Sequence, residues 1–79
     1  MAEFRLTELT LEVIKYRRID EEKIGEALNN PAALVLDQSE PGLCRSSIEI
    51  DPDRTLIVLF YNNKVPWVIK SAFITRKDK

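Results

Sequence analysis

The spacing of apolar residues predicts a helix in the first half of the chain, over residues 20–30. Asp20 can cap its start through a side-chain oxygen, and Pro31 stands where such a helix must end. Apolar residues at intervals of three and four share one face of this helix: Ile24, Ala27 and Leu28. The segment is therefore expected to pack one side against a core.

The preceding segment, residues 7–17, has a mixed pattern. Thr7 can cap a helix, and its apolar residues at helical spacing would then share a face: Leu9, Val13 and Tyr16. Leu11 and Ile14 lie opposite, however, and the β-branched residues of the segment would also suit a strand. We expect a helix here, with a strand as the alternative.

The pattern after residue 31 is that of strands separated by turns. The segments that predict strands are AALVLDQ, LCRSSIEI, TLIVLFY and VPWVIKSAFI. Turn sequences separate them: EPG at 40–42, DPDR at 51–54 and the pair Asn62-Asn63. LCRSSIEI alternates in the way of a strand with one wet face, whereas TLIVLFY is nearly all apolar and predicts a central strand covered on both faces.

These elements predict an α+β fold, with two N-terminal helices packed on one face of a four-stranded antiparallel meander. Residues 75–79 form a polar tail beyond the last strand. That strand carries apolar residues on both sides, Trp67, Ile69 and Phe73 against Val68, Ala72 and Ile74. Because a small monomer rarely exposes so much apolar surface, we expect a partner at an apolar sheet face, either a second copy or a different protein.

Composition limits the chemistry that the chain can perform. Its 79 residues leave room for one domain, residues 1–79, with one small core. No apolar run is long enough for a membrane span and no signal peptide is recognisable, so a cytoplasmic location is expected. The chain has no histidine and one cysteine, Cys44, which we interpret as a small buried residue; neither a metal nor a cofactor is expected.

The acidic residues form no convincing catalytic pair. Asp51 and Asp53 flank Pro52 in a turn, where aspartates favour local backbone hydrogen bonds over metal binding. Glu49 lies on the wet face of its strand, where a solvated charge is the simpler interpretation than a general base.

The basic residues are the remaining candidates for a functional site. With 12 basic and 13 acidic residues, binding of nucleic acid would require a local patch. Lys15, Arg17 and Arg18 end the first helix, where cations also complement the helix dipole. Lys70 interrupts an apolar strand, so its ammonium must reach solvent or face a partner. Convergence of Arg17, Arg45, Lys70 and Arg76 on one face would create an anion site.

The order of these features resembles a family of short bacterial domains of unknown function that is similar to the BrnT and RelE type toxins. The resemblance lies in the segments RRIDEEKI (17–24), ALNNP (27–31), NNPAALVLDQSE (29–40), TLIVLFY (55–61) and VPWVIKSAF (65–73), together with Leu6-Thr7. It covers nearly the whole chain, and it implies the small α+β fold of the messenger-RNA interferases.

The resemblance also implies a function. Toxins of this type cleave RNA without a metal: basic side chains stabilise charge on the phosphate while the 2′-hydroxyl of the RNA attacks. By position, Arg17 and Arg76 would be catalytic. The other basic candidates in this chain, Lys15, Arg18, Arg45 and Lys70, would then be the residues that bind RNA. A cognate antitoxin would be the natural partner.

A non-catalytic interaction or dimerisation domain of the same fold is the alternative. The family often has a histidine early in the first helix, where this chain has Leu9, and BrnT members have an arginine where it has Phe73. Active toxins are also commonly basic, whereas this chain has a net charge of -1. Both hypotheses stay open from sequence alone.

Overall fold

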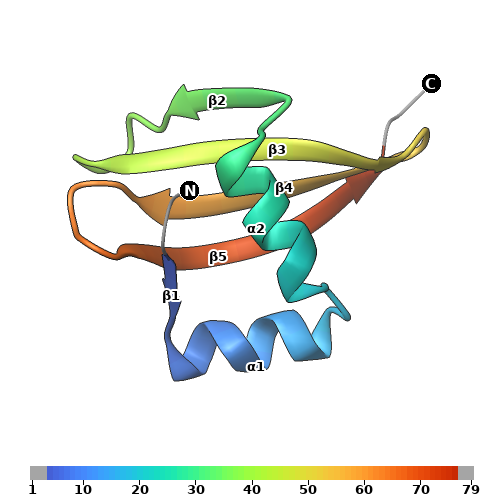
Figure 1. The fold of residues 1–79 in the computed structure, drawn as a ribbon, viewed down its shortest axis with the longest axis horizontal. Helices are drawn as coiled ribbons and strands as arrows, with labels where there is room; N and C mark the ends of the chain where they lie inside the picture. Colours follow the sequence, from blue (N-terminus) through green and yellow to red (C-terminus); the bar gives the residue numbers. More distant parts are fainter. Residues whose placement is uncertain (1–3, 77–79) are drawn as a thin grey trace.

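Two helices and five strands make up the computed structural model, which describes residues 4–76 (Figure 1). In chain order they are β1 (Phe4–Leu6), α1 (Glu8–Tyr16), α2 (Glu21–Asn29), β2 (Ala33–Leu36), β3 (Leu43–Asp51), β4 (Arg54–Tyr61) and β5 (Trp67–Arg76). The α+β class with two helices is confirmed, and residues 7–17 form a helix as expected.

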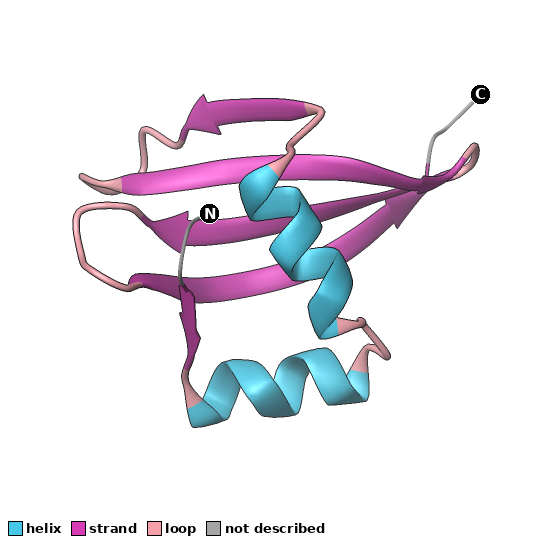
Figure 2. Ribbon diagram, in the orientation of Figure 1, coloured by secondary structure: helices cyan, strands magenta, loops and turns pink. Residues whose placement is uncertain are grey.

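The sheet has five strands in the order β1-β5-β4-β3-β2, so the prediction of four antiparallel strands is wrong. Strands β2 to β5 form an antiparallel meander (Figure 2). Strand β1 adds to the far edge of the sheet, where its residues pair with β5 in parallel register. Strand β1 is three residues long, which is too short to produce a periodic pattern in the sequence.

Both helices begin at the predicted caps. The Thr7 hydroxyl accepts a hydrogen bond from the Thr10 backbone N–H at 3.2 Å, and the Asp20 carboxylate accepts one from the Glu22 N–H at 2.9 Å. Each cap satisfies a backbone donor that the first turn of a helix leaves without an intrahelical partner. The acidic residues that begin α2, Asp20, Glu21 and Glu22, therefore have a structural explanation.

The core lies between α2 and one face of the sheet. The predicted stripe of α2 is fully buried, as are alternate residues of the strands below it: Ile24, Ala27, Leu28, Cys44, Ile48, Leu56, Val58, Phe60, Ile69 and Ala72. Burial of each large aliphatic side chain contributes about 1.5–3 kcal/mol relative to exposure. Cys44 is a buried free cysteine, as predicted, and burial raises the pKa of its thiol.

Helix α2 covers the middle of this sheet face, and α1 lies beside β5 at its margin, where Ile14 joins the same core (Figure 1). Ile57 and Leu59 of β4 point to the uncovered face and are half-buried, so the expectation that both faces of this strand are covered is wrong. The central position of β4, between β3 and β5, is confirmed.

A β-bulge in β5 changes which residues share a face. Leu59 pairs with Ser71 and Phe60 with Ile69, which leaves Lys70 without a partner residue on β4. Beyond the bulge the alternation shifts by one position, so Ala72 joins Ile69 on the core side and Phe73 faces the other way. The predicted grouping of Phe73 with Ile69 is therefore wrong.

The ends of β4 and β5 also differ from the predictions. Thr75 and Arg76 belong to β5 and pair with Thr55 and Arg54, so the predicted tail is wrong for these residues, and its remainder lies outside the described residues. The connection at Asn62 runs over residues 62–66 instead of a two-residue turn.

The turn between β3 and β4 is a local hydrogen-bonded structure. Its Asp51 carboxylate accepts a hydrogen bond from the Asp53 N–H at 2.9 Å and pairs with the Arg54 guanidinium at 2.8 Å. The backbone role that the sequence predicted is confirmed for Asp51.

Ser46 provides a test of the core. Its hydroxyl is fully buried and has no hydrogen-bond partner in the described part of the chain. Because an unpaired buried hydroxyl costs free energy, we expect Ser46→Ala to raise the free energy of unfolding by up to about 1 kcal/mol in urea denaturation. Ser47→Ala, on the opposite face, is the control and should change little. A loss of stability in Ser46→Ala alone would show that the hydroxyl is hydrogen-bonded.

Candidate functional site

The basic residues singled out from the sequence lie in separate parts of the fold. Lys15, Arg17 and Arg18 lie at the end of α1, as expected, and Arg45 is exposed on β3. Lys70 is at the bulge of β5, and Arg76 ends that strand beside Arg54. Strand β4 separates Arg45 from Lys70 in the sheet. Their charges still act on one group, because the pKa of Asp37 is lowered by its hydrogen bonds with Ser39 and then by the charges of both residues.

Arg17 forms a hydrogen bond with the backbone of β5 at the edge of the sheet. Strand β1 pairs only with residues 67–69 of β5, and α1 lies beside the rest of that strand. Arg17 Nη1 donates to the backbone oxygen of Ala72 at 2.8 Å, and Thr10 Oγ1 donates to that of Ile69 at 3.1 Å. These side chains satisfy carbonyls that a neighbouring strand would otherwise bond. The structure thus gives Arg17 a structural role, whatever its chemistry.

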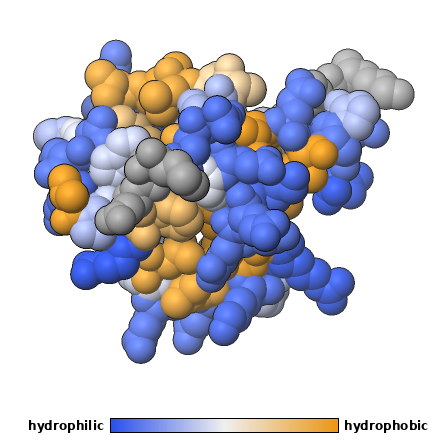
Figure 3. Space-filling model, viewed as in Figure 1, coloured by the Kyte–Doolittle hydropathy of each residue, from blue (hydrophilic) through white to orange (hydrophobic). Residues whose placement is uncertain are grey.

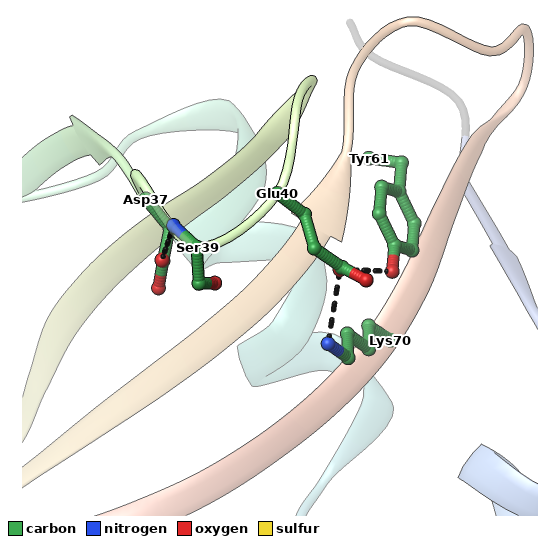
Figure 4. A network of polar contacts seen from close by, with 5 residues as sticks. All are labelled: Asp37, Ser39, Glu40, Tyr61 and Lys70. Carbon is green, nitrogen blue, oxygen red and sulfur yellow. Dashed lines mark hydrogen bonds and ion pairs between the residues drawn. The ribbon is translucent and has the colours of Figure 1, made fainter.

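Lys70 belongs to a polar cluster on the uncovered face of the sheet (Figure 4). The Glu40 carboxylate, in the loop after β2, accepts a hydrogen bond from the Tyr61 hydroxyl at 2.6 Å and one from Lys70 Nζ at 3.0 Å. In the same loop the Asp37 carboxylate accepts from the Ser39 N–H at 2.9 Å. The cluster fastens the 37–42 loop to β4 and β5.

The hydrogen bonds in this cluster shift the pKa values of Glu40 and of its two partners, Tyr61 and Lys70. The hydrogen bond from Tyr61, and then that from Lys70, lowers the pKa of Glu40. The same carboxylate raises the pKa of Tyr61 and that of Lys70, because it stabilises the protonated form of each. Because Glu40 balances the charge of Lys70, the ammonium is already paired and is a poor candidate for binding phosphate.

Sequence reasoning missed a basic groove at the junction of the two helices. This groove of about 190 Å³ is lined by three basic residues, Arg18, Lys23 and Arg54, by the acidic residue Asp20 and by apolar residues that include Leu56 and Ile74. Lys23 lies 3.5 Å from Glu26, and Arg54 is paired with Asp51, so two of the three cations already have acidic partners. The three come from different elements, so no spacing in the sequence could reveal the groove.

Exposed apolar side chains form two surfaces on opposite sides of the sheet. The stripe predicted on α1 exists but faces outward, with Leu9 72% and Tyr16 90% exposed beside a hollow of about 380 Å³. The second surface is β2, where Leu34, Val35 and Leu36 are 56%, 46% and 71% exposed. Figure 3 shows apolar residues gathered over β2 along the upper margin of the molecule. The apolar residues Trp67, Val68, Phe73 and Ile74 of the last strand are only partly exposed, so the most exposed apolar residues lie outside it.

The open edge of β2 also presents backbone groups. The Asp37 N–H bonds the Leu43 oxygen of β3 at 2.9 Å, so Asp37 and the alternate residue Val35 direct their backbone groups inward. Leu34 and Leu36 lie between these positions and direct their N–H and C=O groups away from the sheet. We call this strand with its outward groups the β2 edge.

No metal site or membrane-spanning helix is present in residues 4–76. The chain has no histidine, and within these residues no three Cys, Asp or Glu side chains lie together in a group that could hold a metal ion. Neither described helix is long and apolar enough to cross a membrane.

No family model, curated protein or solved structure matches this chain. The resemblance to the BrnT and RelE type toxins therefore stays a prediction. The described contacts are the basis on which a function can be proposed.

Removal of the Arg17 guanidinium tests its role at the sheet edge. We expect Arg17→Ala to lower the free energy of unfolding by about 1–2 kcal/mol, because it leaves the Ala72 carbonyl without its charged donor. Arg18→Ala is the control, since the structure shows no hydrogen bond from that neighbouring guanidinium to any described residue. Equal stability of the two variants in urea would contradict the structural role of Arg17.

Glu40→Gln tests the polar cluster. The substitution removes the carboxylate that stabilises the Tyr61 hydroxyl, so the pKa of Tyr61 should fall and its phenolate should appear at lower pH in an ultraviolet titration. Glu21→Gln, on α2, is the control and should leave the titration unchanged.

The same variant has a predicted effect on acid stability. Because folding lowers the pKa of Glu40, its contribution to stability is present at neutral pH and is lost as the pH falls through the folded value. Glu40→Gln should therefore lose less stability than the wild type between neutral and acid pH. An unchanged pH dependence would contradict the contacts of Glu40.

Proposed function

We propose that this chain is a protein-interaction domain that binds its partner at the β2 edge. The observation that carries the proposal is the combination of outward backbone groups and exposed apolar side chains on one short strand, β2. An added strand would form hydrogen bonds with the outward backbone groups and would bury the exposed apolar side chains, as in the recognition of peptides by sheet extension.

The contrast between the two edges of the sheet supports this proposal. The other edge strand, β1, is three residues long and carries the exposed charge of Arg5, and Thr10 and Arg17 bond two carbonyls of β5 at and beyond its end. The β2 edge contains no proline, no charged residue and no bulge, which are the usual means of blocking unwanted pairing. Its four-residue length is the one protective feature that it has.

Burial of the exposed side chains supplies a driving force. Complete burial of a Leu or Val side chain contributes about 1.5–3 kcal/mol, and these residues are roughly half to three-quarters exposed. Each therefore has about 1 kcal/mol or more to gain from a partner. In the toxin hypothesis, this is also where a cognate antitoxin would pack.

The second candidate is an RNA-binding or RNA-cleaving domain of the BrnT and RelE type. The groove of Arg18, Lys23 and Arg54 favours it, because clustered cations can bind phosphate. The separation of Arg17, Arg45 and Lys70 and the engagement of Arg17 and Lys70 in other contacts favour the interaction domain. We therefore place the ribonuclease hypothesis second.

Photo-crosslinking in cells tests the interaction domain. A photoreactive amino acid at position 36 is expected to give a covalent product with a bound chain, and the same residue at position 53, in the exposed β3–β4 turn, serves as the control. A product at both positions or at neither would contradict the proposal, since it would show no preference for the β2 edge.

An RNA cleavage assay tests the rival. The purified chain is expected to leave RNA intact in the presence of a metal chelator. Cleavage that is lost in both Arg18→Ala and Arg54→Ala, but kept in Arg45→Ala, would instead assign ribonuclease activity to the groove. Arg17→Ala alone is a poor probe, because it also removes a structural hydrogen bond.

A further inference from the structure

We infer that the partner at the β2 edge is a second copy of this chain, paired with it antiparallel about a two-fold axis at Val35. This inference rests on the proposed function and specifies its partner. The two sheets would then join through their β2 strands into one continuous sheet.

The backbone pattern of β2 is compatible with this symmetry. Leu34 and Leu36 direct their backbone groups outward and lie on either side of Val35. A two-fold axis at Val35 sets Leu34 of each copy opposite Leu36 of the other, and residues opposed in this way exchange both hydrogen bonds. An axis at either leucine would leave the outward groups of the other without that partner.

The side chains match in the same register. Leu34 and Leu36 pair with Ser46 and Cys44 of β3, so they lie on the core side of the sheet, whereas Val35 lies on the uncovered side. Opposed residues of antiparallel strands share a face. The dimer would thus bring the leucines of both copies together on one face and the two Val35 side chains together on the other.

The core-side face has room for this cluster. Helix α2 packs on β3 and β4, and β2 extends beyond it at the margin of the sheet (Figure 1). The side chains of Leu34 and Leu36 consequently have no helix above them. A second copy would cover them with the equivalent leucines.

Charge also permits self-association at this edge. Strand β2 carries no charge, and the proposed register places Asp37 opposite Ala33 of the other copy, so no like charges face each other. The edge offers a partner only apolar side chains and backbone groups, and both are symmetric about Val35. We therefore favour a second copy over a charged peptide.

Because the contact between the two β2 strands is small, we expect a dissociation constant on the order of 10–100 µM for the dimer.

Sedimentation equilibrium of the purified chain over a range of concentrations tests the inference. We expect a reversible monomer–dimer equilibrium that Leu36→Gln weakens at least about tenfold. Leu9→Gln is the matched control, because the two leucines are 71% and 72% exposed, and it should leave the equilibrium unchanged. Leu34→Pro, which removes an outward N–H that β3 does not use, should abolish the dimer in a folded protein.

Cysteine crosslinking tests the register. In the proposed dimer the two Val35 residues form a non-hydrogen-bonded pair with Cα atoms about 4.5 Å apart, close enough for a disulfide. Mild oxidation should therefore crosslink Val35→Cys efficiently, and Leu34→Cys much less, because Leu34 faces Leu36. Crosslinking of both variants to the same extent would overturn the register.

The outcomes separate the inference from the proposed function. A protein that stays monomeric while position 36 crosslinks to a different chain in cells would overturn the self-association and keep the interaction domain. A monomer without a crosslink at position 36 would overturn both. A dimer weakened by Leu9→Gln and unaffected by Leu36→Gln would move the interface to α1 and overturn the inference.

Discussion

At and beyond the end of β1, carbonyl groups of β5 have no strand beside them in residues 4–76, and two side chains of the first helical segment bond them instead. Thr10 bonds the oxygen of Ile69, and Arg17 bonds that of Ala72. These contacts hold the first helix beside the sheet, with Ile14 directed into the core. The position of α1 in turn sets where α2 begins, because only four residues connect the two helices. The core under α2 thus depends on how one edge of the sheet is closed.

This constraint changes the meaning of a basic residue at the end of α1. Cations there complement the helix dipole, and any of Lys15, Arg17 or Arg18 would serve that purpose. These three residues differ in their contacts with β5, because only Arg17 has a described hydrogen bond to a carbonyl of that strand. A long, permanently charged side chain can reach across the edge and still keep part of its guanidinium in water. A fixed arginine in this position therefore does not by itself indicate catalysis.

Local signals in the sequence were sufficient for much of the fold. The caps at Thr7 and Asp20, the stripe of α2 and the alternation of β3 follow from interactions within a few residues, and all are confirmed. Strand β1 and the bulge at Lys70 depend on pairing with distant strands, and the pattern of their own residues gives no indication of it. The bulge then reversed the predicted faces of β5, because a shift of one residue exchanges the two sides of a strand.

The candidate site was less predictable for the same physical reason. Whether Leu36 is buried depends on how far α2 extends across the sheet, and the composition of β2 does not contain that information. Apolar composition predicted a strand here, and the position of β2 at the edge of the sheet makes its side chains a surface. An edge of this kind is a hazard for aggregation unless pairing is limited. The proposed two-fold contact would limit it at β2, because the first pairing occupies the outward backbone groups of that strand in each copy and leaves none there for a third chain.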